Sequence, residues 1–145
     1  MYLRDTTGYM IANTGRRLTS SLTQLFQPYN LTSEQWSLLI ALRLHDGVSQ
    51  KELAELTDKD PANVTRILDQ LQRKGLVRRE ANPDDRRAVC MRITPEGSEV
   101  AATLVPIEER FIEEIVAGIP QADLETFKSV IRAINLNLER RQEAD

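Results

Sequence analysis

The sequence predicts a mainly helical (α+β) fold, a winged helix-turn-helix with flanking N- and C-terminal helices. Residues 49–75 contain two short segments with helical spacing of apolar side chains, and each begins with a good capping residue. Residues 76–93 contain two β candidates around a turn-rich segment, which is the pattern of a hairpin. Longer helical patterns lie on both sides, so the helix-turn-helix and its wing sit in the middle of the chain.

The helix before this region is expected over residues 7 to about 28, because Leu18, Leu22, Leu25 and Phe26 recur at helical spacing before Pro28. A capping box at Thr32–Gln35 starts a second helix, which Asp46-Gly47 ends. Its predicted buried side chains are Trp36, Leu39, Ile40 and Leu44.

The helix-turn-helix is defined by its caps. Ser49 and Glu52 form a second capping-box pattern, followed by the predicted inward residues Leu53, Ala54 and Leu56. Asp60 is suited to cap the next helix, with Pro61 at its first position. Its apolar stripe is Val64, Ile67, Leu68 and Leu71, and Gly75 fits a left-handed cap after the last turn.

The wing is predicted from Leu76–Glu80 and from the alternation of Val89, Met91 and Ile93 with Ala88, Cys90 and Arg92. The Asn-Pro-Asp-Asp cluster at 82–85 predicts the turn, with Arg86 and Arg87 at its tip. Two guanidiniums on a hairpin tip are unsuited to a core but suited to a groove lined with phosphates.

Two helices are expected after the wing. Thr94-Pro95-Glu96 starts the first, and Gly118-Ile119-Pro120 interrupts the pattern. In the last helix an apolar seam for packing against other helices is formed by Leu124, Phe127, Ile131, Ile134 and Leu138.

Charge is distributed unevenly along this chain of 145 residues and net charge −3. Residues 66–92 carry eight Lys and Arg against four Asp and Glu, whereas residues 96–145 carry five against eleven. A polyanion is therefore expected to contact the middle of the chain. The sequence shows no apolar run of membrane-spanning length and no apolar signal core at its start, so a cytoplasmic location is expected.

These residues together resemble the MarR family of winged-helix transcriptional regulators. The family pattern Asp-x-Arg, five residues, Leu-Thr is matched by Asp85-Arg86-Arg87 and Ile93-Thr94, with Ile in place of Leu. Val64–Leu68 and Lys74–Val77 are similar to the family's recognition helix and its exit. The resemblance implies a homodimer on a pseudo-palindromic operator of double-stranded DNA. It also implies an N-terminal dimerisation helix (1–30), a winged helix-turn-helix (31–95) and C-terminal dimerisation helices (96–145).

The candidate DNA-binding residues follow from this arrangement. In the recognition helix Arg66 is placed to bond a guanine edge, and Asn63 to read adenine or hold a phosphate. Arg87 is expected in a minor groove and Arg86 at the backbone, with Asp85 pairing with an arginine. Basic side chains at Arg73, Lys74, Arg78 and Arg79 add to the field or are simply solvated. The full candidate set is Ser49, Gln50, Ala62, Asn63, Thr65, Arg66, Asp85, Arg86 and Arg87.

The resemblance further implies a repressor released by a small anionic or phenolic effector; the alternative is a constitutive or architectural DNA binder or activator without an effector. No cofactor, metal or enzymatic activity is expected, because one His and one Cys make no familiar zinc site and no nucleophile–base pair stands out. Cys90 is expected to be partly exposed, with redox sensing the less favoured hypothesis. His45 is expected at the surface, and Trp36 in the core.

Overall fold

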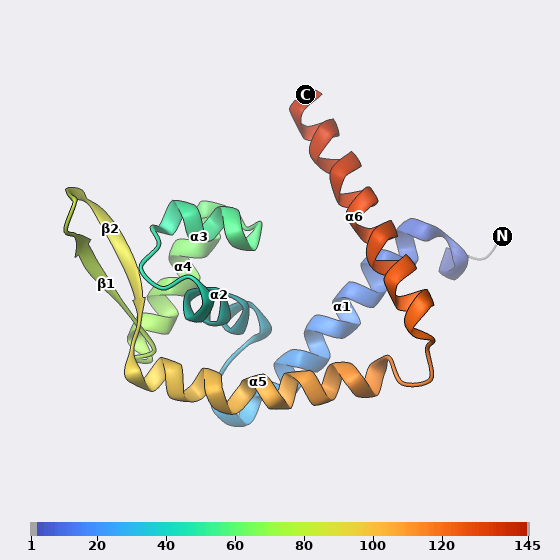
Figure 1. Ribbon diagram of the computed structural model, residues 1–145, viewed down its shortest axis with the longest axis horizontal. Coiled ribbons are helices and arrows are strands. Elements are labelled where there is room, and N and C mark those ends of the chain that lie inside the picture. Colours follow the sequence, from blue (N-terminus) through green and yellow to red (C-terminus); the bar gives the residue numbers. More distant parts are fainter. Residues whose placement is uncertain (1–2, 145) are drawn as a thin grey trace. The chain divides into compact units, whose positions relative to one another are not determined.

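The structure is a computed structural model that describes residues 3–144, apart from the side chain of Arg86. Figure 1 shows the element order along the chain. The helices and strands are η1 (Leu3–Asp5), α1 (Thr7–Phe26), η2 (Gln27–Tyr29), α2 (Ser33–Leu44), α3 (Gln50–Thr57), α4 (Pro61–Arg73), β1 (Val77–Asn82), β2 (Asp85–Ile93), α5 (Pro95–Ile115) and α6 (Gln121–Ala144). The chain divides into two compact units, one up to Glu108 and one from Glu109 onward.

The predicted helix starts of the first unit are confirmed by their hydrogen bonds. The Thr32 hydroxyl accepts from the Gln35 backbone N–H at 3.1 Å, and the Gln35 side chain accepts from Thr32 N–H at 3.2 Å. Ser49 Oγ accepts from Glu52 N–H at 3.1 Å, and Asp60 Oδ2 accepts from Asn63 N–H at 3.2 Å. These side chains satisfy amides that the first turn leaves without helical partners.

The wing is a two-stranded antiparallel hairpin with an additional partner on its outer edge. Val77 faces Ile93, and the register continues regularly to Ala81 opposite Val89. Gly47 N–H donates to Met91 O at 2.9 Å and Met91 N–H donates to Val48 O at 2.8 Å, so the segment before α3 pairs with β2. The connection between α2 and α3 therefore joins the sheet, which the sequence did not predict.

The core of the first unit lies where α2, α3 and α4 meet the base of the wing. Its largest fully buried side chains are Phe26, Leu38, Leu39, Leu42, Leu53, Val64, Ile67, Leu68, Leu71, Val77, Met91 and Leu104. Trp36 packs against Phe26, with ring centroids 5.3 Å apart, which confirms its core position. At the start of α5, Gly97 passes so close to Leu76 O that a Cβ there would lie 2.1 Å from it. Only glycine fits this position.

Four predicted side-chain environments are wrong. Leu44, expected on the buried side of α2, is 72% exposed at the last position of that helix. Leu56 is 50% exposed, because the buried arc of α3 is centred between Leu53 and Ala54 and Leu56 falls about a third of a turn away. Cys90 is buried, since the segment at Ser49 forms a bridge opposite it. Val89 is exposed although its neighbours Cys90 and Met91 are both buried, so β2 does not follow simple alternation.

The second unit contains the end of α5 and the whole of α6. Gly118 has φ of 81°, a left-handed conformation, and precedes the interruption at Pro120. No residue of α6 within the described chain is buried; Phe127 and Leu138 are exposed, whereas Leu124, Ile131 and Ile134 are partly covered. Among residues 3–144 no helix has the length and apolar character needed to cross a membrane.

Candidate nucleic-acid interface

Helix α4 turns one face into the core and the opposite face outward. Val64, Ile67, Leu68 and Leu71 are buried, whereas Ala62, Thr65 and Arg66 are exposed and Asn63 is partly covered. A helix that buries every third and fourth residue leaves the intervening positions on its outer side. The N-terminal half of α4 therefore presents the four candidate DNA-binding residues of this helix on one accessible surface.

A polar network fixes this surface to α3 and to the wing. Gln50 Nε2 donates to Thr65 Oγ1 at 3.1 Å, and Arg79 Nε donates to Gln50 Oε1 at 3.0 Å. Arg79 also donates from Nη2 to Asp69 Oδ1 at 2.7 Å and from Nη1 to Gln72. The side chain of Arg79 is only 26% exposed. Arg79 is thus a structural link rather than a solvated charge, and Gln50 is held at both ends of its amide.

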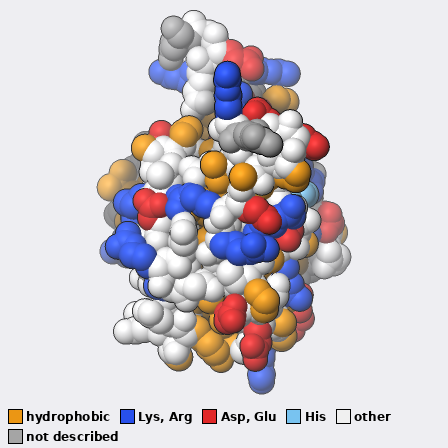
Figure 2. Space-filling view, turned by 90° about the vertical axis from the view of Figure 1, so that its left-hand side faces the viewer, with side chains coloured by type: hydrophobic (Ala, Val, Ile, Leu, Met, Phe, Trp, Pro, Cys, Tyr) orange, Lys and Arg blue, Asp and Glu red, His pale blue; other side chains and the backbone are white. Residues whose placement is uncertain are grey.

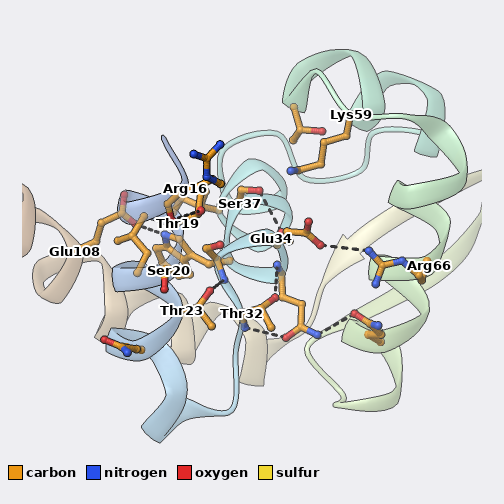
Figure 3. Close-up of a pocket in the computed structure, with 18 residues that line it drawn as sticks. Arg16, Thr19, Ser20, Thr23, Thr32, Glu34, Ser37, Lys59, Arg66 and Glu108 are labelled. Carbon is orange, nitrogen blue, oxygen red and sulfur yellow. Dashed lines mark hydrogen bonds and ion pairs between the residues drawn. The ribbon is translucent and has the colours of Figure 1, made fainter. Parts of the chain in front are cut away.

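Arg66 also has partners within the protein. Its Nη2 donates to Glu34 Oε2 of α2 at 3.2 Å (Figure 3). The same nitrogen donates to Asn63 Oδ1 one turn earlier in α4. Both members of the ion pair are about half exposed, at 53% and 51%. Arg66, the residue predicted to read guanine, is therefore accessible but already bound to the carboxylate of Glu34. No sequence pattern indicates this ion pair.

The arginines of the wing lie just after the tip. Pro83 and Asp84 form the turn, and Arg86 and Arg87 belong to the start of β2, which corrects the prediction that they form the tip itself. Asn82 faces Asp85 whereas Ala81 faces Val89, so residues 86–88 fall in an irregularity of the register. Such a bulge redirects side chains away from the regular alternation.

Asp85 acts on the backbone of the wing. Its Oδ1 accepts from Arg87 N–H at 3.0 Å, and both side chains are exposed. No salt bridge joins Asp85 to an arginine among the described side chains, so the expected pairing stays a prediction. The side chain of Arg86 lies outside what the structure describes.

Acidic side chains accompany the basic ones on the face that carries the wing. Figure 2 shows Lys and Arg side chains interspersed with Asp and Glu on this face. Arg92 pairs with Glu80 at 3.0 Å and with Asp46 at 3.7 Å, and Arg78 approaches Glu80 at 3.8 Å. The local positive excess is consequently reduced at the base of the wing, whereas the exposed Arg87 beyond it forms no salt bridge with the described carboxylates.

A second feature of the first unit is an open pocket of about 990 Å³ beside the recognition helix. Its wall includes the apolar Leu22, Trp36 and Ile40 and three cations, Arg16, Lys59 and Arg66 (Figure 3). The indole N–H of Trp36 donates to a carboxylate oxygen of Glu108 at its edge. An apolar wall with few charged groups is the usual composition of a small-molecule site.

Other candidate roles are tested by burial and spacing. The hydroxyl of Ser49 is used as a helix cap, and His45 is the exposed C-cap of α2.

Burial lowers the pKa of Lys74, whose ammonium donates to Gln35 Oε1 at 2.8 Å and to the Asn30 carbonyl. Lys74 therefore anchors the end of α4. Within residues 3–144 no group of three or more His, Cys, Asp or Glu is arranged to hold a metal.

A capped recognition helix, a preceding helix and a hairpin wing define the winged helix-turn-helix class, and comparisons place the chain within it. The family model described as "MarR family" matches residues 31–89. "Transcriptional regulator HosA" of Escherichia coli O111:H- is 29% identical over 120 residues, covering 77% of this chain and 89% of that protein. The chain is therefore similar to regulators of the MarR family.

Two solved structures share the fold. The Staphylococcus aureus MepR–DNA complex has a TM-score of 0.86 at 20% identity, covering 94% of this chain and 99% of that chain. Bordetella bronchiseptica BpsR, a protein whose DNA binding is regulated by 6-hydroxynicotinic acid, has a TM-score of 0.85 at 23% identity, covering 93% and 96%. At these identities the likeness concerns the fold.

Proposed function

We propose that the protein is a dimeric transcriptional repressor that binds a pseudo-palindromic operator in the cytoplasm and is released by a small anionic effector. Transcriptional regulation through DNA is the function of the MarR family, which the chain resembles. The observation that carries the proposal is the outward face of α4, where Ala62, Asn63, Thr65 and Arg66 lie together on a helix fixed at its start. In this fold class the start of the second helix enters the major groove.

The contacts around α4 and the exposure of Arg87 support different roles for α4 and for the wing in DNA binding. Thr65 is held by Gln50, so its position relative to α3 is fixed before DNA arrives. Arg87, which is exposed in the wing, is the residue proposed for the minor groove, where A·T-rich tracts concentrate negative potential. Ser49, Gln50, Asp85 and Arg86 complete the proposed contact surface.

Apolar side chains that the isolated chain leaves accessible support a dimer. In α6, Phe127 is 59% exposed and Leu138 is 54% exposed, and in α1 Met10 is 54% exposed. Water contact with this much apolar surface is unfavourable, and a second copy of the same helices covers it. The proposed dimer region therefore comprises residues 1–30 and 96–145, with residues 31–95 binding DNA.

The pocket beside α4 supports an effector of defined chemistry. Arg16, Lys59 and Arg66 favour an anion, and Trp36 with its apolar neighbours favours an aromatic ring. The regulator of BpsR, 6-hydroxynicotinic acid, is an aromatic acid and so belongs to the same chemical class. Because Arg66 belongs both to the pocket and to the DNA face, an anion there competes directly with DNA.

The test is equilibrium binding of the protein to the DNA upstream of its own gene, with random duplex of equal length as the reference. Specific binding should exceed binding to random duplex by at least about a thousandfold and weaken as salt is raised. Equal affinity for both duplexes would refute the repressor proposal. An operator complex that no aromatic acid dissociates would refute the effector part alone.

A further inference from the structure

Glu34 lies outside the helix-turn-helix but touches its recognition helix. It belongs to the first turn of α2, directly after the Thr32 cap. Its Oε2 accepts a hydrogen bond from Arg66 Nη2 at 3.2 Å, across 32 residues of sequence (Figure 3). The same nitrogen donates to Asn63 Oδ1. Nη2 carries two hydrogens, so these two acceptors use both of them.

What Arg66 is able to recognise depends on which of its nitrogens Glu34 and Asn63 occupy. A guanidinium has two edges that form parallel hydrogen bonds, one made by Nε with Nη2 and the other by Nη1 with Nη2. A bidentate contact with O6 and N7 of guanine needs one complete edge. Because Nη2 belongs to both edges, neither is complete while Glu34 and Asn63 hold it. Single contacts to phosphate through Nη1 or Nε remain available.

The strength of the ion pair matters as well as its geometry. Both side chains are about half exposed, so water screens the attraction and the pair is weak. Arg66 lies on the outer side of α4, away from the buried stripe of Ile67 and Leu68. A guanine edge is therefore able to displace the carboxylate, but the net gain from that contact is reduced by the cost of opening the pair.

We infer that Glu34 is an internal competitor for the base-reading edges of Arg66 and thereby limits both operator affinity and discrimination at one base pair. The inference rests on the proposed DNA-binding function and adds a specificity-determining residue from α2. In a complex with the wrong base Arg66 stays with Glu34, and only the correct base separates them. Removing the carboxylate therefore increases the difference in binding free energy between the correct base and the other bases at this position.

The experiment compares wild type with Glu34→Gln, which keeps the shape of the side chain and removes its charge. Affinity is measured for the upstream operator, for operators with single base-pair substitutions and for random duplex. We expect Glu34→Gln to bind the operator about two- to fivefold more tightly, the range of an exposed ion pair. The penalty for substituting the base pair read by Arg66 should increase, while the penalties elsewhere stay constant.

Two further variants separate this effect from general electrostatics. Arg66→Ala identifies the base pair concerned, and in that background Glu34→Gln should change neither affinity nor discrimination there. Glu52→Gln removes an exposed carboxylate of α3 that has no ion-pair partner among the described residues, and it reports the effect of net charge alone. Thermal melts check that all variants fold.

Each outcome decides one point. Absence of operator-specific binding by wild type refutes the proposed function itself, before Glu34 is considered. Specific binding by wild type with unchanged or weaker binding by Glu34→Gln overturns the inference, since the carboxylate then positions Arg66 rather than competing for it. An equal gain in the Arg66→Ala background, or from Glu52→Gln, also overturns it.

Discussion

Arg79 of β1 donates from Nη2 to Asp69 Oδ1 of α4 at 2.7 Å, so the first strand of the wing is tied directly to the recognition helix. The same guanidinium reaches Gln50 of α3 at 3.0 Å, and Gln50 in turn reaches Thr65 at 3.1 Å. One side chain thus sets the mutual position of three elements that the proposal assigns to DNA. Asp69 would otherwise present a lone negative charge on the outer side of α4.

Replacement of Arg79 by Met is expected to weaken both folding and DNA binding. It removes a partly buried, charge-assisted interaction and leaves Asp69 and Gln50 without this partner, at a cost of about 1 to 2 kcal/mol in unfolding free energy. Chemical denaturation measures that loss, and operator affinity should fall at least about tenfold because Asp69 then faces phosphate. Arg78→Met is the matched control, since Arg78 is 59% exposed and lies 3.8 Å from Glu80. Equal losses in both variants would contradict a specific role for Arg79.

Arg87→Ala is expected to reduce the salt dependence of operator binding. A single lost contact with the DNA phosphates or the minor groove lowers the slope of log affinity against log salt by about 1. Arg43→Ala provides the comparison, because Arg43 is an exposed cation in the last turn of α2 and outside the proposed contact set. An unchanged slope for Arg87→Ala would remove this residue from the interface.

The sequence predicted the parts of the fold that depend on local interactions. Thr32, Ser49, Asp60 and Gly75 act where expected, because a cap depends on residues three or four positions away or on a single φ angle. The outer face of α4 was likewise predictable from the spacing of its buried residues.

The parts of the fold that the sequence did not predict all involve contacts between residues distant in sequence. The pairing of Met91 with Gly47 and Val48, and the ion pair of Arg66 with Glu34, join segments that only the folded chain brings together. Composition predicted a basic middle segment, but it did not show that Arg79 and Arg92 are bound to neighbouring carboxylates.

Cys90 is expected to react slowly with thiol reagents in the native protein. It is 7% exposed and covered by the segment at Ser49, and access requires local opening of the outer edge of the wing. Its reaction with Ellman's reagent should be at least about tenfold slower than in the unfolded chain. Operator binding should be unaffected by mild peroxide. Rapid native labelling with loss of DNA binding would instead support redox sensing.

Phe127→Glu is expected to convert a dimer into a monomer and to weaken operator binding strongly. A charge in the apolar seam of α6 has to be desolvated when a second copy covers it, which costs several kcal/mol. Light scattering measures the mass and gel shift measures the affinity. Thr126→Glu introduces the same charge at the neighbouring exposed position outside the seam and should leave the dimer intact. Dimers of equal stability for both variants would place the interface elsewhere.

Trp36 allows the proposed effector pocket to be tested directly, because it is the sole tryptophan of the chain and lines that pocket. It is 4% exposed, and its indole N–H donates to Glu108, so its emission depends on the pocket and on this carboxylate. Titration with hydroxybenzoates should give a saturable change in fluorescence, and the melting temperature should rise with ligand concentration.

Arg16→Ala should weaken this binding about three- to tenfold by removing a cation from the pocket wall. Arg17→Ala, which removes the neighbouring exposed charge outside the pocket, should not. If the fluorescence change persists equally in both variants, or if saturating ligand leaves operator affinity unchanged, the pocket is not the site of release. By contrast, displacement of a pocket-bound ligand by operator DNA would show that DNA and the effector compete for the protein. The proposal requires this competition because Arg66 belongs both to the pocket and to the DNA-binding face.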